Sequence, residues 1–502
     1  MPMATATSPA GRAARSTVAS LFEAQARVHP RRVAIASAER TLEYGELAGR
    51  ARRLAAALAA RGVGRGDRVA VLAENRPEIL ELFLAAAHLG AIVACQSWRL
   101  APPELAHCVG LVTPVLSLAS PRHATSLPAP IVFGPEYEAL LAAAPPLADR
   151  DVDPEDPLLI LYTSGTTGLP KGAVISQRAQ IVRNLVTRAE FGVAPDDTFV
   201  AWSPLYHMGA VDNSLGTLMS GGKVITVPGF DPDRLAEIVA DEPLGWLLLM
   251  PGMVGRFAEV LRRRDTRPRG VKVCGVMADL VPPSEIAAIT TLLRAPYANT
   301  FGATETGCPP CSSSLIPIGA LPTRLSKRQS PFCEIRLVDA ADRDVADGTP
   351  GELIMRGPTL FSGYWDAPET NARDFRGGWF HMGDVFSRNP DGSLDFVDRV
   401  KYLIKSGGEN VYPAEIERVL LQDPRVAEAC VVRRRDPQWG EVPVAYVARR
   451  DDTLAEADLL SRCRAELAGF KQPRHITFLP LEAFPRSASG KIQRHELEAR
   501  DA

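Results

Sequence analysis

The chain has 502 residues and a mass of 54.2 kDa, which is too long for one compact core and predicts roughly two to four cores or subdomains. Hydrophobic residues make up 46% and charged residues 23%, which excludes a mainly disordered, collagen-like or disulfide-stapled chain. The 57 Lys+Arg nearly balance the 59 Asp+Glu, so no global basic field exists to hold nucleic acid or an anionic membrane.

The sequence predicts neither a membrane span nor a secretory signal, and its acid-poor, Arg- and Ser-bearing N-terminus is interpreted as a frayed tail, with a transit peptide as the alternative. No apolar run reaches the roughly 18 residues that a membrane span needs. The N-terminal stretch MPMATATSPAGRAARS lacks the apolar core of a secretory signal. Eight sparse, irregularly spaced cysteines predict a reducing, cytoplasmic setting. The oligomeric state stays open, and a homodimer is one alternative.

The first 150 residues alternate helical and strand patterns. Strands separated by helices predict βαβ units and a parallel sheet, and this alternation continues to about residue 300. The segment Pro121–Pro157 is rich in Pro and Ala and predicts an irregular connection. The expected elements are helices at Tyr44–Arg61 and Ile79–Leu89 and strands at Arg68–Leu72, Ala91–Cys95 and Leu158–Tyr162.

The pattern changes after residue 330. Short alternating runs with Gly, Pro and Asp turns over Cys333–Asp398 predict antiparallel β structure, arranged as a small barrel-like subdomain. We place a domain boundary at Arg399–Lys401, which gives domains 1–399 and 400–502. The second domain is expected to be α+β, with elements at Ala414–Leu421, Val426–Val432, Val442–Ala448 and Leu454–Ala468.

The strongest motif is Tyr162-Thr-Ser-Gly-Thr-Thr-Gly-Leu-Pro-Lys-Gly172, which follows a short apolar strand. Glycines let backbone N–H groups approach an anion, hydroxyls donate further hydrogen bonds, and a lysine adds a point charge. The motif is not a Walker A loop, because Pro170 stands where that loop needs its second glycine. It predicts a polyphosphate site, and Lys171 is one of only eight lysines in the chain.

This segment resembles the phosphate loop of the adenylate-forming superfamily, which includes acyl-CoA synthetases. Six further motifs in the superfamily's order resemble its acyl-site, nucleotide, hinge and C-terminal lysine motifs. They are Ser203–Met208, Phe301–Glu305, Gly351–Pro358, Trp379–Asp384, Asp398–Glu417 and Pro485–Ile492. The resemblance implies a large N-terminal α/β domain and a small, mobile C-terminal lid.

The resemblance also implies which residues bind ATP and Mg²⁺. Glu305 would hold Mg²⁺, which prefers oxygen ligands. Asp384 would accept hydrogen bonds from the ribose hydroxyls although Met382 replaces the usual Thr of that motif, and Arg399 would contact ribose or phosphate. The remaining expected nucleotide residues are Thr163, Ser164, Gly165, Thr166, Thr167, Gly168 and Lys171, together with Phe301, Gly302 and Ala303.

Lys491 is the predicted catalytic lysine. A carboxylate and an α-phosphate repel each other, and one ammonium group that contacts both lowers this repulsion and stabilises the transition state. By resemblance, His207 lies near the acyl carboxylate. Thr304 and Glu305 complete the expected catalytic set.

A thiol acceptor is implied as well. In the superfamily the lid turns about a hinge, here Lys401, and brings a glycine-rich segment across the acyl adenylate to form a pantetheine tunnel. The expected CoA contacts are Gly407, Gly408, Glu409, Trp439 and Phe470, with Lys471 and Arg474 as candidate partners of the CoA phosphates.

The acyl pocket is expected among apolar residues. Val276-Met277 stand where many members carry Gly-Gly, and this bulk favours an aryl or small-to-medium acid over a long fatty acid. Asp212 is the nearest acid that could pair a substrate amine, and the pair Cys308 and Cys311 lacks the second Cys/His pair of a zinc site. The expected pocket residues are Trp202, His207, Met208, Asn213, Met250, Val276, Met277, Phe301 and Cys308.

The sequence therefore predicts an AMP-forming carboxylic acid–CoA ligase that uses ATP, Mg²⁺ and coenzyme A. It would first form acyl-AMP and pyrophosphate and then acyl-CoA and AMP. One alternative acceptor is the phosphopantetheine of a separate carrier protein. A second alternative, a nucleotide-binding regulator without catalysis, is disfavoured by the presence of Lys171, Glu305, Asp384 and Lys491.

Overall fold

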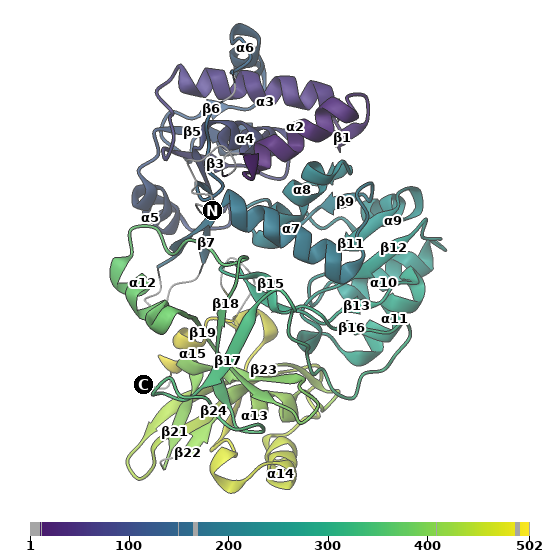
Figure 1. Cartoon of the computed structure of the whole chain (residues 1–502). Helices are drawn as coiled ribbons and strands as arrows, with labels where there is room; N and C mark the ends of the chain where they lie inside the picture. The colour runs from purple at the N-terminus through teal and green to yellow at the C-terminus, as the bar shows by residue number, and fades with distance from the viewer. Residues whose placement is uncertain are drawn as a thin grey trace. The chain divides into compact units, whose positions relative to one another are not determined.

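The computed structural model describes residues 11, 13–148, 150–163, 169–407, 409–486 and 492–500 (Figure 1). The chain forms two compact units. Unit 1 comprises Met1–Glu334 and Arg356–Phe375, and unit 2 comprises Ile335–Met355 and Arg376–Ala502. The boundary predicted at residues 399–401 lies inside unit 2 and stays a prediction.

The first sheet of unit 1 has six strands in the order β6-β5-β3-β4-β7-β8. All pairs are parallel except β7 with β8, and the central strands are buried apolar runs, as expected for a parallel sheet covered on both faces. The predicted strands are confirmed within one residue at each end. Their bounds are β3 (Arg68–Leu72), β4 (Ile92–Cys95), β5 (Leu116–Ala119), β6 (Ile131–Val132), β7 (Pro157–Thr163) and β8 (Lys171–Ser176).

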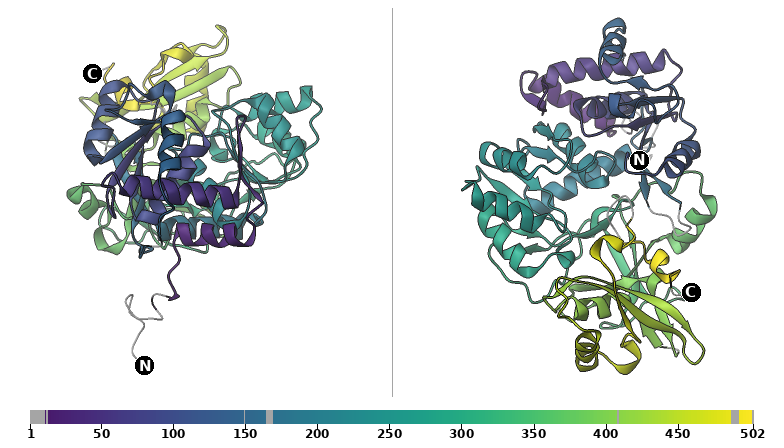
Figure 2. Two further views of the ribbon diagram at one scale, coloured as in Figure 1. Left: turned by 90° about the horizontal axis from the view of Figure 1, so that it is seen from above. Right: turned by 180° about the vertical axis from the view of Figure 1, so that it is seen from behind.

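Helices cover this sheet, and two of them match the sequence patterns. The predicted helices at residues 44–61 and 79–89 are confirmed as α3 (Tyr44–Ala59) and α4 (Pro77–Leu89). Pro77 starts α4, and Gly90 ends it with φ 67°, a left-handed conformation that glycine adopts without strain. Two further helices are α2 (Val18–Val28), which lies beside α3 in Figures 1 and 2, and α5 (Pro102–Val112).

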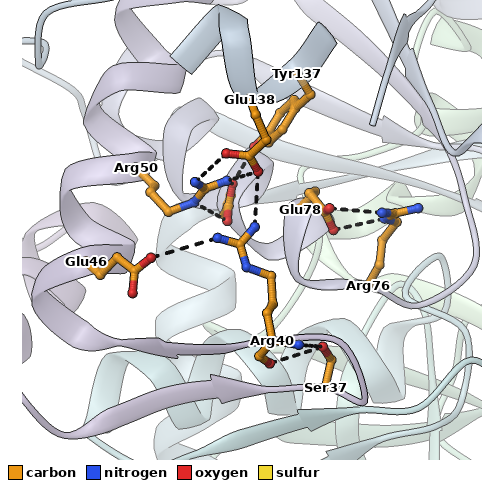
Figure 3. A network of polar contacts seen from close by, with 9 residues as sticks. Ser37, Arg40, Glu46, Arg50, Arg76, Glu78, Tyr137 and Glu138 are labelled. Carbon is orange, nitrogen blue, oxygen red and sulfur yellow. Dashed lines mark hydrogen bonds and ion pairs between the residues drawn. The ribbon is translucent and has the colours of Figure 1, made fainter. Parts of the chain in front are cut away.

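The irregular connection predicted over residues 121–157 is wrong in part. It contains α6 (Pro135–Ala143), which starts with Pro135 and buries Tyr137. A polar network fixes α6 to α3 and α4 (Figure 3). The guanidinium of Arg50 lies 2.7 Å from the fully buried Glu81 and 2.8 Å from Glu138, and Tyr137 donates a 2.5 Å hydrogen bond to Glu81. A buried charge such as that of Glu81 must be paired, so these contacts determine the position of α6 on α3 and α4.

Two smaller sheets complete unit 1. The sheet β2-β1-β10-β9 contains β1 (Val33–Ala36), β2 (Thr41–Glu43), β9 (Phe199–Ala201) and β10 (Val224–Thr226). The helix α8 (Met208–Ser220) packs against β9 and β10, and α7 (Gln177–Phe191) packs against α8. The sheet β11-β12-β13-β16 contains β11 (Leu244–Leu247), β12 (Val271–Cys274), β13 (Tyr297–Ala298) and β16 (Leu315–Ile316). Its helices are α9 (Pro232–Asp241), α10 (Val254–Arg263) and α11 (Pro283–Leu293), and α12 (Pro368–Asp374) follows later.

The antiparallel pairing predicted after residue 333 is confirmed between β18 and β19 and between β19 and β20. The strands β17 (Glu334–Val338), β18 (Gly351–Arg356), β19 (Phe380–Arg388) and β20 (Leu394–Arg399) form a four-stranded sheet in that order, and closure into a barrel stays a prediction. A second sheet has the path β22-β21-β24-β23, with β25 on β24. Its bounds are β21 (Ile404–Ser406), β22 (Glu409–Val411), β23 (Val426–Asp436), β24 (Gly440–Arg449) and β25 (Ile476–Phe478), with α13 (Pro413–Leu420), α14 (Glu456–Glu466) and α15 (Arg494–Glu498).

Candidate active site

The predicted phosphate motif joins two antiparallel strands of unit 1. β7 and β8 pair so that Thr163 and Lys171 are opposite each other at the base of the loop. The five loop residues Ser164, Gly165, Thr166, Thr167 and Gly168 lie outside the described residues, and their predicted role stays a prediction. The pairing of the two strands fixes the side of the sheet on which Lys171 lies, because a one-residue shift in register would turn its side chain to the opposite face.

Lys171 lies against an aromatic ring. Its Nζ is 3.8 Å from the centroid of the Tyr364 ring, which is a cation–π contact. The same Nζ lies 3.9 Å from Oδ2 of Asp374 at the end of α12. The side chain of Lys171 is 21% exposed, so it remains reachable from solvent.

Glu305 contacts the same tyrosine. It follows β14 (Phe301–Ala303), which pairs with β15 (Gly307–Cys311) in a tight hairpin. A Cβ atom on Gly302 would lie 2.0 Å from the carbonyl oxygen of Gly307, so the hairpin requires glycine there. The Tyr364 hydroxyl donates a 2.8 Å hydrogen bond to Oε1 of Glu305. Lys171 and Glu305, 134 positions apart in the sequence, thus meet on one side chain.

This arrangement fits a magnesium–nucleotide. Mg²⁺ is commonly held by one or two carboxylates together with substrate phosphates, and it keeps several waters. The half-buried Glu305 would supply one such carboxylate, and Lys171, on the ring of the same tyrosine, would supply positive charge for the phosphates. Among the described residues, no group of three or more His, Cys, Asp and Glu could hold a metal by itself.

The predicted acyl residues come from several parts of unit 1, and the first part is the segment from Trp202 to Asn213. Trp202 is 3% exposed and donates its indole N–H to the Leu248 carbonyl at 2.8 Å, and it packs in one core cluster with Met250. His207 is the N-cap residue of α8, and its ring lies 4.5 Å from that of Tyr206. Asn213, five residues after Met208 in α8, donates to the Gly209 carbonyl at 2.8 Å.

Val276 and Met277 form a constrained loop. The Tyr297 hydroxyl donates to the Val276 carbonyl at 3.0 Å. Met277 has φ 50°, a left-handed conformation that is uncommon for a residue with a side chain. A Cβ on Gly275 would lie 2.1 Å from the Tyr297 ring, so this ring fixes the course of the loop. Asp279 follows and forms a 2.5 Å ion pair with the fully buried Lys327.

Cys308 lies near the ion pair of Arg183 and Asp212. Its Sγ is 3.9 Å from Oγ1 of Thr187, and burial raises the pKa of its thiol to about 12. Asp212 lies nearby, 3.4 Å from Nη1 of the buried Arg183. Burial raises the pKa of Asp212, and Arg183 opposes that shift. Asp212, the nearest acid that could pair a substrate amine, is thus paired with Arg183, and its role in substrate binding stays a prediction.

In unit 2, the predicted ribose residue is part of the β19–β20 ladder. Asp384 pairs in register with Arg399, and the Arg399 Nε lies 3.0 Å from Asp384 Oδ1. The Asp384 side chain is 4% exposed, so its carboxylate is rigidly placed. The neighbouring Asp398 accepts hydrogen bonds from the backbone N–H groups of Arg399 and Ala414, and it thereby joins β20 to the start of α13.

The predicted CoA residues of unit 2 lie close together around β21 and β22. The Gly407 N–H donates to the Trp439 carbonyl at 2.8 Å, and a Cβ on Gly407 would lie 2.7 Å from the indole ring. Trp439 is 42% exposed and Phe470 is 40% exposed, and the turn that carries Phe470 contacts β22, which begins at Glu409. Lys471 is engaged by Glu415 at 2.8 Å, and Lys401 lies over the Tyr402 ring at 4.8 Å. Gly408 and Lys491 lie outside the described residues.

Sequence reasoning missed Tyr364 and Arg183. Arg183 donates to the carbonyl oxygens of Thr304 and Thr359, so it supports the loop before Glu305. Tyr364 stands in Gly363-Tyr364-Trp365, shortly after a recognised motif, and an aromatic residue at that position was the available signal. For Arg183, a single basic residue in an ordinary helix, the local sequence carries no comparable signal.

Comparison with known proteins shows which protein family the chain belongs to. The model of the AMP-binding enzyme family matches residues 22–365, and the model of its C-terminal domain matches residues 415–491. The chain belongs to the AMP-binding enzyme family. It is 33% identical over 497 residues to an indoleacetate–CoA ligase of Aromatoleum aromaticum, with 95% of this chain and 96% of the relative covered.

Two further comparisons agree with this. A feruloyl-CoA synthase of an Amycolatopsis species is 33% identical over 486 residues, with 95% of this chain and 97% of the relative covered. The ATP-bound structure of MatB from Rhodopseudomonas palustris is 27% identical and superposes with a TM-score of 0.83, covering 97% of this chain and 99% of that one. The predicted α/β fold, the AMP-forming acid–thiol ligase class and the use of ATP, Mg²⁺ and CoA are thereby confirmed.

The helices of the described residues are all too short or too polar to cross a bilayer.

Proposed function

We propose that this member of the AMP-binding enzyme family joins an aromatic or arylalkyl carboxylic acid to coenzyme A. The observation that supports the proposal is that Lys171 and Glu305 both contact Tyr364, because these are the residues proposed to bind the phosphates and Mg²⁺. The bulk of Val276 and Met277, together with the indoleacetate and feruloyl acids in the names of two relatives, supports an aromatic acid.

Each charged residue has a proposed task in the first half-reaction. Lys171 binds the β- and γ-phosphates, Glu305 holds Mg²⁺ and Asp384 binds the ribose hydroxyls. Lys491 contacts both the acid carboxylate and the α-phosphate, where it stabilises the charge of the transition state. His207 orients the carboxylate at the start of α8. Mg²⁺ held by Glu305 would supply positive charge against the phosphates of ATP.

The second half-reaction requires a thiol. The exposed Trp439 and Phe470, together with Gly407, Gly408 and Glu409, are proposed to contact CoA, and Lys401 is proposed as the hinge. The CoA sulfur attacks the acyl carbonyl carbon, the thioester forms and AMP leaves. The alternative acceptor is the phosphopantetheine arm of a separate carrier protein, which would use the same thiol chemistry.

Acid-dependent exchange of pyrophosphate with ATP tests the first half-reaction without CoA. A panel of indole-3-acetate, ferulate, benzoate, octanoate and palmitate then ranks the acids by kcat/KM for CoA-dependent AMP formation. We expect kcat/KM to be at least about tenfold higher for the aromatic acids than for palmitate, because a misfit of a few methylene groups in an apolar pocket produces a factor of that size. Faster turnover of palmitate would contradict the proposed substrate class, and AMP release with a holo carrier but not with CoA would favour the alternative.

Lys491→Ala and Lys272→Ala form a matched pair for the proposed catalytic role. Lys272 is a partly exposed lysine of unit 1 that makes a 2.7 Å ion pair with the buried Asp197, so Lys272→Ala is expected to lower the stability of the protein and to leave acid-dependent exchange unchanged. Lys491→Ala is expected to lower the rate of acid-dependent exchange by a factor of about 10²–10³, because one group that stabilises the charge of the transition state is lost. Equal exchange rates in the two variants would contradict the role of Lys491.

We also propose a cytoplasmic location. All eight cysteines of the chain lie in the described part and are free thiols, and seven of them are buried. Free thiols are typical of reducing compartments. The homodimer stays a prediction that sedimentation analysis tests.

A further inference from the structure

The backbone around Tyr364 is held against the strand that begins with Lys171. Tyr364 forms an antiparallel bridge with Ala173, and the Trp365 N–H donates to the Gly172 carbonyl at 2.8 Å. Asn371 fixes the residue from the other side. Its Oδ1 accepts the Tyr364 N–H at 2.7 Å, and its Nδ2 donates to the Tyr364 carbonyl at 2.8 Å. The position of Tyr364 relative to β8 is therefore set by backbone hydrogen bonds.

The side chain of Tyr364 makes two different charged contacts with two different parts of its phenol group. The face of the ring lies under Nζ of Lys171 at 3.8 Å, and the hydroxyl donates to Oε1 of Glu305 at 2.8 Å. The residue is 7% exposed.

Phe361 holds both partners of that hydrogen bond in place. Its N–H donates to the Glu305 carbonyl at 2.8 Å, and its ring packs edge-to-face on the Tyr364 ring at 4.9 Å. The Phe361 ring also stacks on Phe375 at 5.3 Å. Tyr364 and the backbone of Glu305 are thus fixed to one aromatic cluster.

We propose that Tyr364 is a positioning residue that sets the spacing between the phosphate-binding ammonium group of Lys171 and the metal-binding carboxylate of Glu305. A rigid phenol ring, unlike two flexible side chains, keeps both charged groups at fixed positions before MgATP arrives. Lys and Glu side chains lose rotamer freedom when they bind a ligand, and a prearranged pair has less freedom left to lose. This inference rests on the roles proposed for Lys171 and Glu305.

The two contacts can be removed one at a time. Tyr364→Phe keeps the ring under Lys171 and removes one oxygen atom, so only the contact to Glu305 is lost. Tyr364→Leu removes both contacts. Tyr137→Phe is the matched control, because Tyr137 is a buried tyrosine of the same unit whose hydroxyl donates to the buried carboxylate of Glu81.

Binding measured without the acid gives a readout that does not depend on turnover. Mn²⁺, used as the probe, is titrated into protein with saturating ATP and followed by electron paramagnetic resonance, and metal-free ATP binding is measured by calorimetry in EDTA. Tyr364→Phe is expected to weaken Mn²⁺ binding about tenfold and to leave metal-free ATP binding unchanged, since residues that orient a metal ligand commonly contribute 10–100-fold in metal affinity. Tyr364→Leu is expected to weaken metal-free ATP binding about threefold as well, from the lost cation–π contact.

Equal Mn²⁺ affinity in Tyr364→Phe and the unaltered protein would overturn the inference, as would an equal loss of Mn²⁺ affinity in Tyr137→Phe. If Tyr364→Leu does not fold, Tyr364→Phe still decides, since it alters a single atom. Failure of the proposed function has a different signature: the unaltered protein would then show no acid-dependent exchange, whatever its Mn²⁺ affinity.

Discussion

Arg183 donates a hydrogen bond of 3.0 Å from Nη2 to the carbonyl oxygen of Thr304, the residue that precedes Glu305. Its Nε donates to the Thr359 carbonyl at 2.9 Å, and its Nη1 lies 3.4 Å from Asp212. The guanidinium is 1% exposed. One buried cation on α7 thus fixes the loop of the candidate metal ligand, a second chain segment and a buried carboxylate on α8.

Arg183→Met is expected to lower the free energy of unfolding by about 3–5 kcal/mol, because it leaves Asp212 as a buried charge without its cation. Urea unfolding followed by circular dichroism measures this loss. Adding Asp212→Asn removes the buried charge and should recover part of the stability. Additive losses in the double variant would show that Arg183 and Asp212 do not interact energetically.

Met277→Gly is expected to widen the acyl preference. It removes the side chain from the constrained loop, and the left-handed backbone at φ 50° suits glycine, so the stability should change by about 1 kcal/mol or less. The ratio of kcat/KM for octanoate to that for benzoate should rise about tenfold. Arg294→Gly is the control, because Arg294 also has a positive φ, 53°, at the end of α11. A change of the same size in this ratio in Arg294→Gly would contradict the placement of Met277 in the wall of the acyl pocket.

Trp439→Ala is expected to separate the two half-reactions. Pyrophosphate–ATP exchange should stay within about twofold of the unaltered rate, whereas the KM for CoA should rise about tenfold, since an aromatic contact to a ligand is worth about 1–3 kcal/mol. Phe332→Ala is the matched control, because Phe332 is 41% exposed and Trp439 is 42% exposed. Parallel losses in exchange and thioester formation would instead assign Trp439 to domain stability.

Glu138→Gln tests the network of Figure 3 through pH. The hydrogen bond from Arg50 holds the pKa of Glu138 below its ordinary value of 4.5. The stabilisation by Glu138 is therefore complete above pH 4.5 and is lost as the pH falls through the lowered value. The difference in unfolding free energy between the unaltered protein and Glu138→Gln should be constant above about pH 5.5, at about 1 kcal/mol or less, and should shrink below pH 4.5.

Glu46→Gln is the control for that measurement. Glu46 lies 3.8 Å from Arg40 and is 52% exposed, so its pairing should contribute little at any pH. A difference for Glu138→Gln that does not vary with pH would contradict the lowered pKa.

The sequence predicted the local elements far better than the long-range contacts. The strand at residues 68–72 was predicted to the residue, because a short apolar run follows a glycine-rich turn. α6 was missed, since its neighbours are Pro and Ala and its stability comes from Arg50 and Glu81, far away in the chain. Seven motifs predicted Lys171, Glu305 and Asp384 by resemblance. The contacts of Tyr364 with Glu305 and of Arg183 with Thr304 join residues 59 and 121 positions apart, and no local pattern encodes such distances.

The native thiols make the chain suitable for fluorescence labelling. Seven of the eight cysteines are buried, and burial raises the pKa of the half-buried Cys308 to about 12, so the thiolate that reacts with maleimides is scarce at neutral pH. Dyes could therefore be attached at Asp151→Cys and Asp452→Cys, whose parent side chains are 82% and 94% exposed, without deleting a native cysteine. Energy transfer between one dye on each unit would then report the distance between them during turnover.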